Sequence, residues 1–209
     1  MIRTYEFVVV HTGAAFNQKR QRVEHHTFEM VRRDHMLPVA RHDAAGKLVP
    51  GTGGRGFKDI GYNRYIEVDG KIRLGRLDAV AGAHTEGFND RSLGVCCSGS
   101  GDHEPFNAAQ LRSLVAQCAA WCRLYSLPAE RVIGHREAPA FGAKPTSKTC
   151  PGKLVDMDVI RGLVRDELLG AWRGGVALEG LARCPPAAPA SDDAEPPSTR
   201  RSGRPKAGA

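Results

Sequence analysis

Short β-branched runs alternate with segments of helical periodicity along this chain, and that alternation limits the folds open to it. Residues 6–10 are typical of a buried strand, and residues 27–36 are predicted to form a helix. A strand at 92–97 precedes a helix that Asn107 begins as its N-cap. A short strand at 131–133 and an amphipathic helix at about 155–172 follow. We therefore expect an α/β fold, a central mixed β-sheet flanked by about three helices.

A β-hairpin is predicted between the first helix and the 92–97 strand. Apolar and polar residues alternate in 62–68 and again in 71–74, and Asp69-Gly70 between them favours a type I′ turn. The preceding stretch, 37–59, contains Pro38, Pro50 and a Gly-rich cluster at 51–54, which indicate a long loop. The stretch from 136 to 149 is likewise expected to be a loop.

Length and composition predict one domain, residues 1–172, and a tail, residues 173–209. The tail is rich in Pro and Ala and has few large apolar residues, so we expect it to be disordered. Its end carries a basic cluster formed by Arg200, Arg201, Arg204 and Lys206, which could contact an anionic envelope, although a merely solvated tail is the simpler interpretation.

The net charge of +7 is compatible with nucleic acid, an acidic membrane surface or an anionic bacterial envelope as a partner. No nucleic-acid motif is present, so nucleic acid is the least favoured of these. No apolar run approaches the length of a transmembrane helix, and residues 7–10 are too short for the core of a signal peptide. We therefore expect synthesis in the cytoplasm.

Six cysteines occur without a signal peptide, which favours thiols or metal ligands over a disulfide framework. Cys118 and Cys122 lie four residues apart on one helical face, where buried hydrophobic packing is favoured over a structural zinc site.

Three residues have the character of zinc ligands. His11 and His135 each follow a short apolar strand, and Cys150 lies before Pro151-Gly152. A hydrolytic zinc site requires three nitrogen or sulfur ligands and an open fourth position. These residues could converge at one edge of the sheet, but spacing alone leaves open that each histidine is an ordinary hydrogen-bonded residue.

A series of short motifs occurs along residues 5–170. They are Val9–Thr12, Asp59–Asn63, Val68–Ile72, Gly75–Arg76, Gly82–His84, Asn89 with Ser92–Cys96, Gly134–Arg136 and Lys148–Gly152. In this order the motifs resemble those of the N-acetylmuramoyl-L-alanine amidases, and within them the T-odd phage lysozyme and peptidoglycan recognition protein family. So many blocks in the expected order are improbable by chance.

The resemblance implies that His11, His135 and Cys150 hold one zinc ion in a cleft at one edge of the sheet. Cytoplasmic wall-recycling amidases of this superfamily usually have Asp where this chain has Cys150, and recognition-only relatives usually have Ser. The cysteine therefore favours an active phage-type or bactericidal enzyme.

The implied reaction is hydrolysis of the amide between the lactyl group of N-acetylmuramic acid and L-alanine of the stem peptide. Lys148 matches the lysine that stabilises the oxyanion, and Tyr62 matches the tyrosine that hydrogen-bonds the zinc-bound water. An exposed loop lysine and a half-buried strand-edge tyrosine are the alternatives. Asn63 departs from the commonest phage pattern, which has His after this tyrosine.

His84 matches a residue of the substrate groove, and Asn89 and Arg76 are further groove candidates, although either could be a structural hydrogen-bonding residue. The other histidines match no motif and are expected to be solvated or on helix surfaces: His25, His26, His35, His42 and His103.

The expected partner is bacterial peptidoglycan, and the expected state is a monomer. A phage endolysin, made in the host cytoplasm and acting on the wall in the periplasm after release, fits the missing signal peptide. A catalytically silent peptidoglycan-binding or regulatory protein and a cytosolic wall-recycling amidase are the alternatives.

Overall fold

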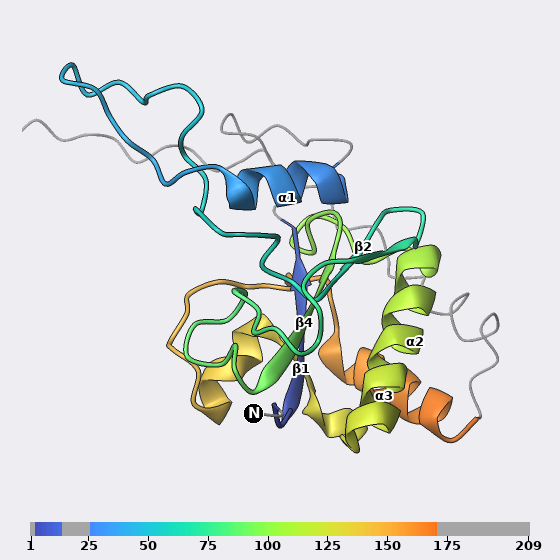
Figure 1. Cartoon of the computed structure of the whole chain (residues 1–209). Helices are drawn as coiled ribbons and strands as arrows, with labels where there is room; N and C mark the ends of the chain where they lie inside the picture. The colour runs from blue at the N-terminus through green and yellow to red at the C-terminus, as the bar shows by residue number, and fades with distance from the viewer. Residues whose placement is uncertain (1–2, 14–25, 171–209) are drawn as a thin grey trace, which may run out of the picture.

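The computed structural model describes residues 3–13 and 26–170, so the predicted tail, the end of the last helix at Trp172, His25 and Cys184 lie outside the described residues (Figure 1). Strands and helices follow one another in the predicted order. They are β1 (Phe7–Thr12), α1 (Phe28–Met36), β2 (Arg64–Ile66), β3 (Ile72–Leu74), β4 (Ser92–Cys97), α2 (Ala108–Tyr125), β5 (Val132–Gly134) and α3 (Met157–Leu168), with two 3₁₀ helices, η1 (Ala129–Arg131) and η2 (His135–Phe141).

The five strands form one mixed sheet in the order β3-β2-β4-β1-β5. β2, β4, β1 and β5 run parallel, and β3 pairs antiparallel with β2 at the edge. The predicted α/β class and mixed sheet are confirmed. Because β1 and β4 are buried on both faces, their sequences are continuous apolar runs instead of alternating ones.

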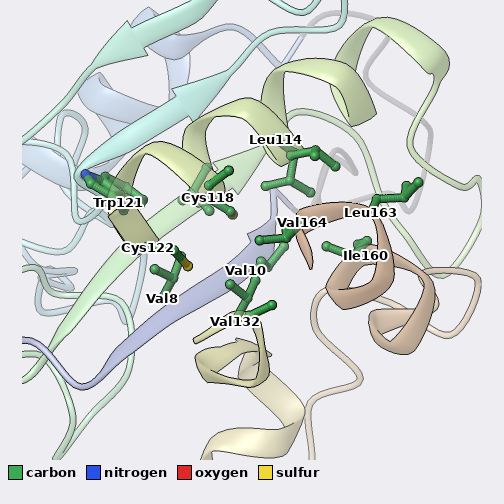
Figure 2. Close-up of a cluster of buried hydrophobic side chains, with 14 of the residues drawn as sticks. Val8, Val10, Leu114, Cys118, Trp121, Cys122, Val132, Ile160, Leu163 and Val164 are labelled. Carbon is green, nitrogen blue, oxygen red and sulfur yellow. The ribbon is translucent and has the colours of Figure 1, made fainter. Parts of the chain in front are cut away.

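The two faces of the sheet are covered by different elements. On one face, α2 and α3 pack together against the sheet, with Val8 and Val10 of β1 pointing into this cluster (Figure 2). The opposite face carries Phe7 and Val9 in a smaller cluster with Ile133, and a third cluster joins α1 to Tyr65 and Cys96. Successive residues of β1 therefore alternate between the two sides.

Side-chain caps set the helix starts. Asn107 accepts a hydrogen bond from the backbone N–H of Gln110, and the Gln110 side chain accepts one from the backbone N–H of Asn107, which confirms the predicted N-cap. Thr27 caps α1. α3 begins at Met157 instead of Val155, because the Asp156 side chain accepts from two backbone N–H groups of the first turn.

Three local predictions were wrong. The 69–70 turn is not type I′, because only Gly70 has positive φ; Glu67 O accepts from Gly70 N and closes a longer turn. Residues 67 and 68 lie in that turn, so β2 is shorter than predicted. Residues 135–141 form η2, not a loop. The 37–59 stretch is irregular as predicted, with isolated bridges at Val39–Gly54 and His42–Leu48.

Cys118 and Cys122 are buried in the core beneath α2, as predicted (Figure 2). Among the described residues, no helix is long and apolar enough to cross a membrane.

Candidate metal centre

Strand register places the two predicted histidine ligands side by side. β1 and β5 are parallel neighbours, with Val9 opposite Ile133. Two residues further along, on the same face, come His11 and His135, whose ring centroids are 4.8 Å apart. His11 is 2% exposed. The carboxyl ends of parallel strands are where α/β sheets bind ligands, and both imidazoles lie at that edge.

Cys150 lies in the loop between η2 and α3. Its Sγ lies 3.6 Å from Nδ1 of His11. The ligand atoms of His11, His135 and Cys150 all lie within 4.8 Å of one another, and no other such group of three metal-binding side chains occurs in the described part of the chain.

Arg136, the residue after the second histidine, holds the Cys150 loop in place. Its guanidinium donates to the carbonyl oxygens of Thr149 (3.3 Å), Gly152 (2.7 Å) and Val155 (2.8 Å). The backbone N–H of Arg136 also donates to the carbonyl of Cys150, at 2.7 Å. The second histidine and the cysteine loop are thus joined through one side chain.

A second contact fixes the loop from the segment after β4. Asp102 accepts from the Thr149 hydroxyl at 2.6 Å and from the backbone N–H of Lys153 at 2.8 Å. Gly152 has φ of +120° and its backbone lies against Gly101, where a Cβ atom would come within 2.0 Å of the Gly101 carbonyl carbon. Only glycine fits this approach.

The three side chains fit a zinc ion by their chemistry and spacing. Two imidazoles and one thiolate form a common zinc donor set that leaves a fourth position open. In tetrahedral zinc, nitrogen and sulfur ligands at their usual bond lengths lie about 3.6 Å apart. The observed Nδ1–Sγ separation of 3.6 Å agrees with that value.

Burial controls the ionisation of all three groups. It is the largest cause of the lowered pKa of His11 and of His135, so both imidazoles are neutral at neutral pH, the form that binds metals. Burial also raises the pKa of the Cys150 thiol to about 11, against the opposing effects of the Thr12 backbone N–H and the Lys148 charge.

Tyr62 lies beside the cluster. Its ring centroid is 5.2 Å from that of His11, and burial raises the pKa of its hydroxyl well above the ordinary value, so the phenol keeps its proton. The ring centroid of His35 also lies 5.6 Å from that of Tyr62. His35 accepts a hydrogen bond from Gly61 N at 2.9 Å. His35 was expected to be solvated or on a helix surface; it lies on α1, but its ring is half-buried and hydrogen-bonded, and burial lowers its pKa to about 4.

Lys148 is exposed on the loop that carries Cys150. Its positive charge contributes to the lowered pKa of both His11 and His135, which places the charge close to the cluster.

Each of the three predicted groove residues makes at least one polar contact inside the protein. His84 Nδ1 lies 3.1 Å from Nε2 of His11. Asn89 Oδ1 accepts from the backbone N–H groups of His84 and Thr85, and Arg76 donates to the carbonyls of Ile60 and Ala81. Burial, the largest cause, lowers the pKa of His84 to about 3. Substrate contact by these three residues stays a prediction.

Sequence reasoning missed the structural importance of Asn63, Arg136 and Asp102. Asn63 is fully buried; its side-chain amide donates to three carbonyls of the 76–80 loop, and its Oδ1 accepts from Gly94 N. Asn63, which stands where the commonest phage pattern has His, thus holds the 76–80 loop against β4 and takes no part in the cluster of His11, His135 and Cys150. Arg136 adjoins His135 in a quoted motif, which was the only signal for it.

Known proteins with similar sequences include phage endolysins and peptidoglycan recognition proteins. The endolysin of Escherichia phage T7 is 31% identical over 98 residues, 43% of this chain and 65% of that protein. The chain thus spans slightly less than two thirds of that relative's length. Human peptidoglycan recognition protein 3 is 36% identical over 85 residues, 40% of this chain and 25% of that protein.

Solved structures share the fold. The N-acetylmuramoyl-L-alanine amidase LysC from Clostridium intestinale superposes with a TM-score of 0.57 at 22% identity, covering 77% of this chain and 85% of that one. An endolysin of a Thermus scotoductus bacteriophage gives a TM-score of 0.53 at 21% identity, covering 78% and 88%. The sequence model of the family described as N-acetylmuramoyl-L-alanine amidase matches residues 2–153, more than half of the chain, and the protein therefore belongs to that family.

Proposed function

We propose that this protein is a zinc hydrolase that cleaves the amide between the lactyl group of N-acetylmuramic acid and L-alanine in peptidoglycan. The observation that carries the proposal is the convergence of the ligand atoms of His11, His135 and Cys150 within 4.8 Å. A silent binding protein would have no use for a complete set of three zinc donors beside a buried tyrosine. Membership of the amidase family supplies the substrate class.

Five side chains of the site would have distinct roles in the reaction. His11, His135 and Cys150 would hold the zinc ion, which when bound polarises a carbonyl and lowers the pKa of a coordinated water. Tyr62 keeps its proton, and its ring lies beside His11, so its hydroxyl would be available as a hydrogen-bond donor to the zinc-bound water. Lys148 supplies a positive charge beside the ligands, where negative charge develops on the attacked carbonyl oxygen.

We further propose that the protein is a phage endolysin acting on the bacterial wall, with peptidoglycan as its partner. Several similar proteins are named endolysins and come from phages. Cys150 supports an active enzyme over a recycling or silent relative. The basic residues at the end of the tail would add contact with an anionic envelope.

The test combines metal analysis with digestion of purified peptidoglycan. We expect the wild type to hold one zinc ion per chain and to release stem peptides with a free N-terminal L-alanine. Cys150→Ser should lose zinc and activity, and Lys148→Met should keep zinc but lose activity. Lys144→Met is the matched control, because Lys144 lies on the same loop but pairs with Glu86 at the surface.

Specific outcomes would contradict the proposal. Undiminished digestion after zinc removal would exclude the mechanism, and new reducing sugar ends would indicate a glycosidase. Tight binding to peptidoglycan without any product would favour the silent binding protein. Turbidity loss of outer-membrane-permeabilised Gram-negative cells would then test the endolysin role separately.

A further inference from the structure

A buried polar arrangement lies directly behind His11, on the side away from the thiol. His11 turns Nδ1 toward Cys150, so its Nε2 points in the opposite direction along the ring. That atom lies 3.1 Å from Nδ1 of His84 and 3.4 Å from Oγ1 of Thr85. Two polar side chains therefore meet the one ring nitrogen that would not bind metal.

The direction of the His11–His84 hydrogen bond follows from the chemistry of the ligand. If Nδ1 of His11 binds a metal, its lone pair is used there and the ring proton must sit on Nε2. Nε2 is then a donor, so Nδ1 of His84 must accept. The opposite arrangement would place a proton on Nδ1 of His11 and block coordination.

The protein holds His84 firmly in this accepting position. Its ring rests on two glycines: a Cβ atom at Gly82 or Gly94 would lie 2.3 or 2.5 Å from Cδ2 of His84. The backbone N–H groups of His84 and Thr85 both donate to Oδ1 of Asn89, at 2.8 and 2.9 Å. Ring position and loop conformation are thus fixed separately.

We propose that His84 is a positioning residue that fixes His11 in the tautomer and orientation needed to bind metal through Nδ1, with Asn89 holding its loop. The inference rests on the proposed zinc function, and it gives His84 a role other than substrate contact. Hydrogen-bond partners of metal-bound histidines typically change metal affinity 10- to 100-fold when removed. Nε2 of His84 is itself buried and has no hydrogen-bond partner among the described residues, which a purely structural histidine would have little reason to tolerate.

Two variants of nearly equal shape test the role. Asn keeps an acceptor, Oδ1, at the position of Nδ1, whereas Leu places a methyl group there. We expect His84→Leu to lower zinc affinity at least about tenfold, measured by competition with a chelator, and His84→Asn to stay within about threefold of the wild type. Urea unfolding of the metal-free proteins checks that both variants remain folded.

A second readout separates positioning from general stability. In the metal-free wild type and His84→Asn, NMR of the imidazole nitrogens should show His11 protonated at Nε2, whereas metal-free His84→Leu should also populate the tautomer protonated at Nδ1. Equal zinc affinity in His84→Leu and the wild type would overturn the inference, as would an equal loss of affinity in both variants. If the wild type itself bound no zinc, the proposed function would fail instead, so the two failures are distinguishable.

Discussion

Arg136 is the side chain whose removal should test the architecture of the site most directly. Arg136→Met keeps the aliphatic stem and removes the guanidinium, so the carbonyls of Thr149, Gly152 and Val155 lose the hydrogen bonds that it donates. A hydrogen bond to a charged group contributes about 1.5–3 kcal/mol. Two of the three bonds are 2.8 Å or shorter, and the side chain is only half-buried, so we take the lower figure for each. The expected loss in free energy of unfolding is about 3 kcal/mol.

The assay is urea unfolding of the metal-free protein, followed by the fluorescence of the buried Trp121. Arg165→Met is the matched control, since Arg165 is about half exposed and makes one surface ion pair with Glu130. The control should lose at most about 1 kcal/mol. The loss in free energy of unfolding for Arg136→Lys should fall between those of Arg136→Met and the control, because an ammonium cannot span two carbonyls as a guanidinium does. Equal losses in Arg136→Met and Arg165→Met would refute the reasoning.

Three further predictions concern stability. Asp78→Ala should cost about 3 kcal/mol in urea unfolding, because Asp78 pairs with Arg64 at 2.9 Å and accepts from Trp121 Nε1 at 2.9 Å; a loss under 1 kcal/mol would contradict this. Asn107→Ala should cost about 1 kcal/mol through loss of the α2 cap, and Asn107→Asp, which can still cap, should lose less. The pKa of His35 in the folded protein, about 4, lies below its ordinary value of 6.5, so the unfolded chain binds the proton at a higher pH than the folded one. The stability that is present above pH 6.5 should therefore be lost as the pH falls toward 4. His35→Asn keeps an acceptor for the backbone N–H and should flatten that dependence; an unchanged slope would show that another group causes it.

The sequence was sufficient for the order of the main strands and helices and for naming three side chains that the structure brings together, but not for what holds those side chains in place. Strand runs and the Asn107 cap are local signals, and the structure confirms them. The pairing of Val9 with Ile133 depends on contacts more than 100 residues apart, which periodicity does not encode. Arg136 acts on carbonyls of an irregular loop, and backbone carbonyls carry no residue-specific signal.

Two further features of the structure could not be inferred from the sequence: the contact of His84 with His11 and the turn at Asp69-Gly70. The 82–89 loop turns His84 inward toward His11 because two glycines leave room for its ring, and a motif match does not specify on which side of the cleft a side chain lies. The hairpin turn was inferred from a dipeptide preference. The observed turn extends back to Glu67, so only Gly70 needs positive φ and the residue before it is free of that demand.

The candidate centre therefore consists of two parts with different physical origins. His11 and His135 are fixed by the register of two parallel strands within a buried sheet, so their separation cannot change without disturbing the core on both faces. Cys150 reaches the histidines only through a loop, and that loop keeps its place through the Arg136 and Asp102 contacts. The imidazole pair is thus the rigid half of the centre and the thiol its adjustable half. Substitutions of Arg136 or Asp102 should consequently change metal affinity while leaving the sheet intact. Substitutions that shift β1 against β5 should instead disrupt the sheet and the metal site together.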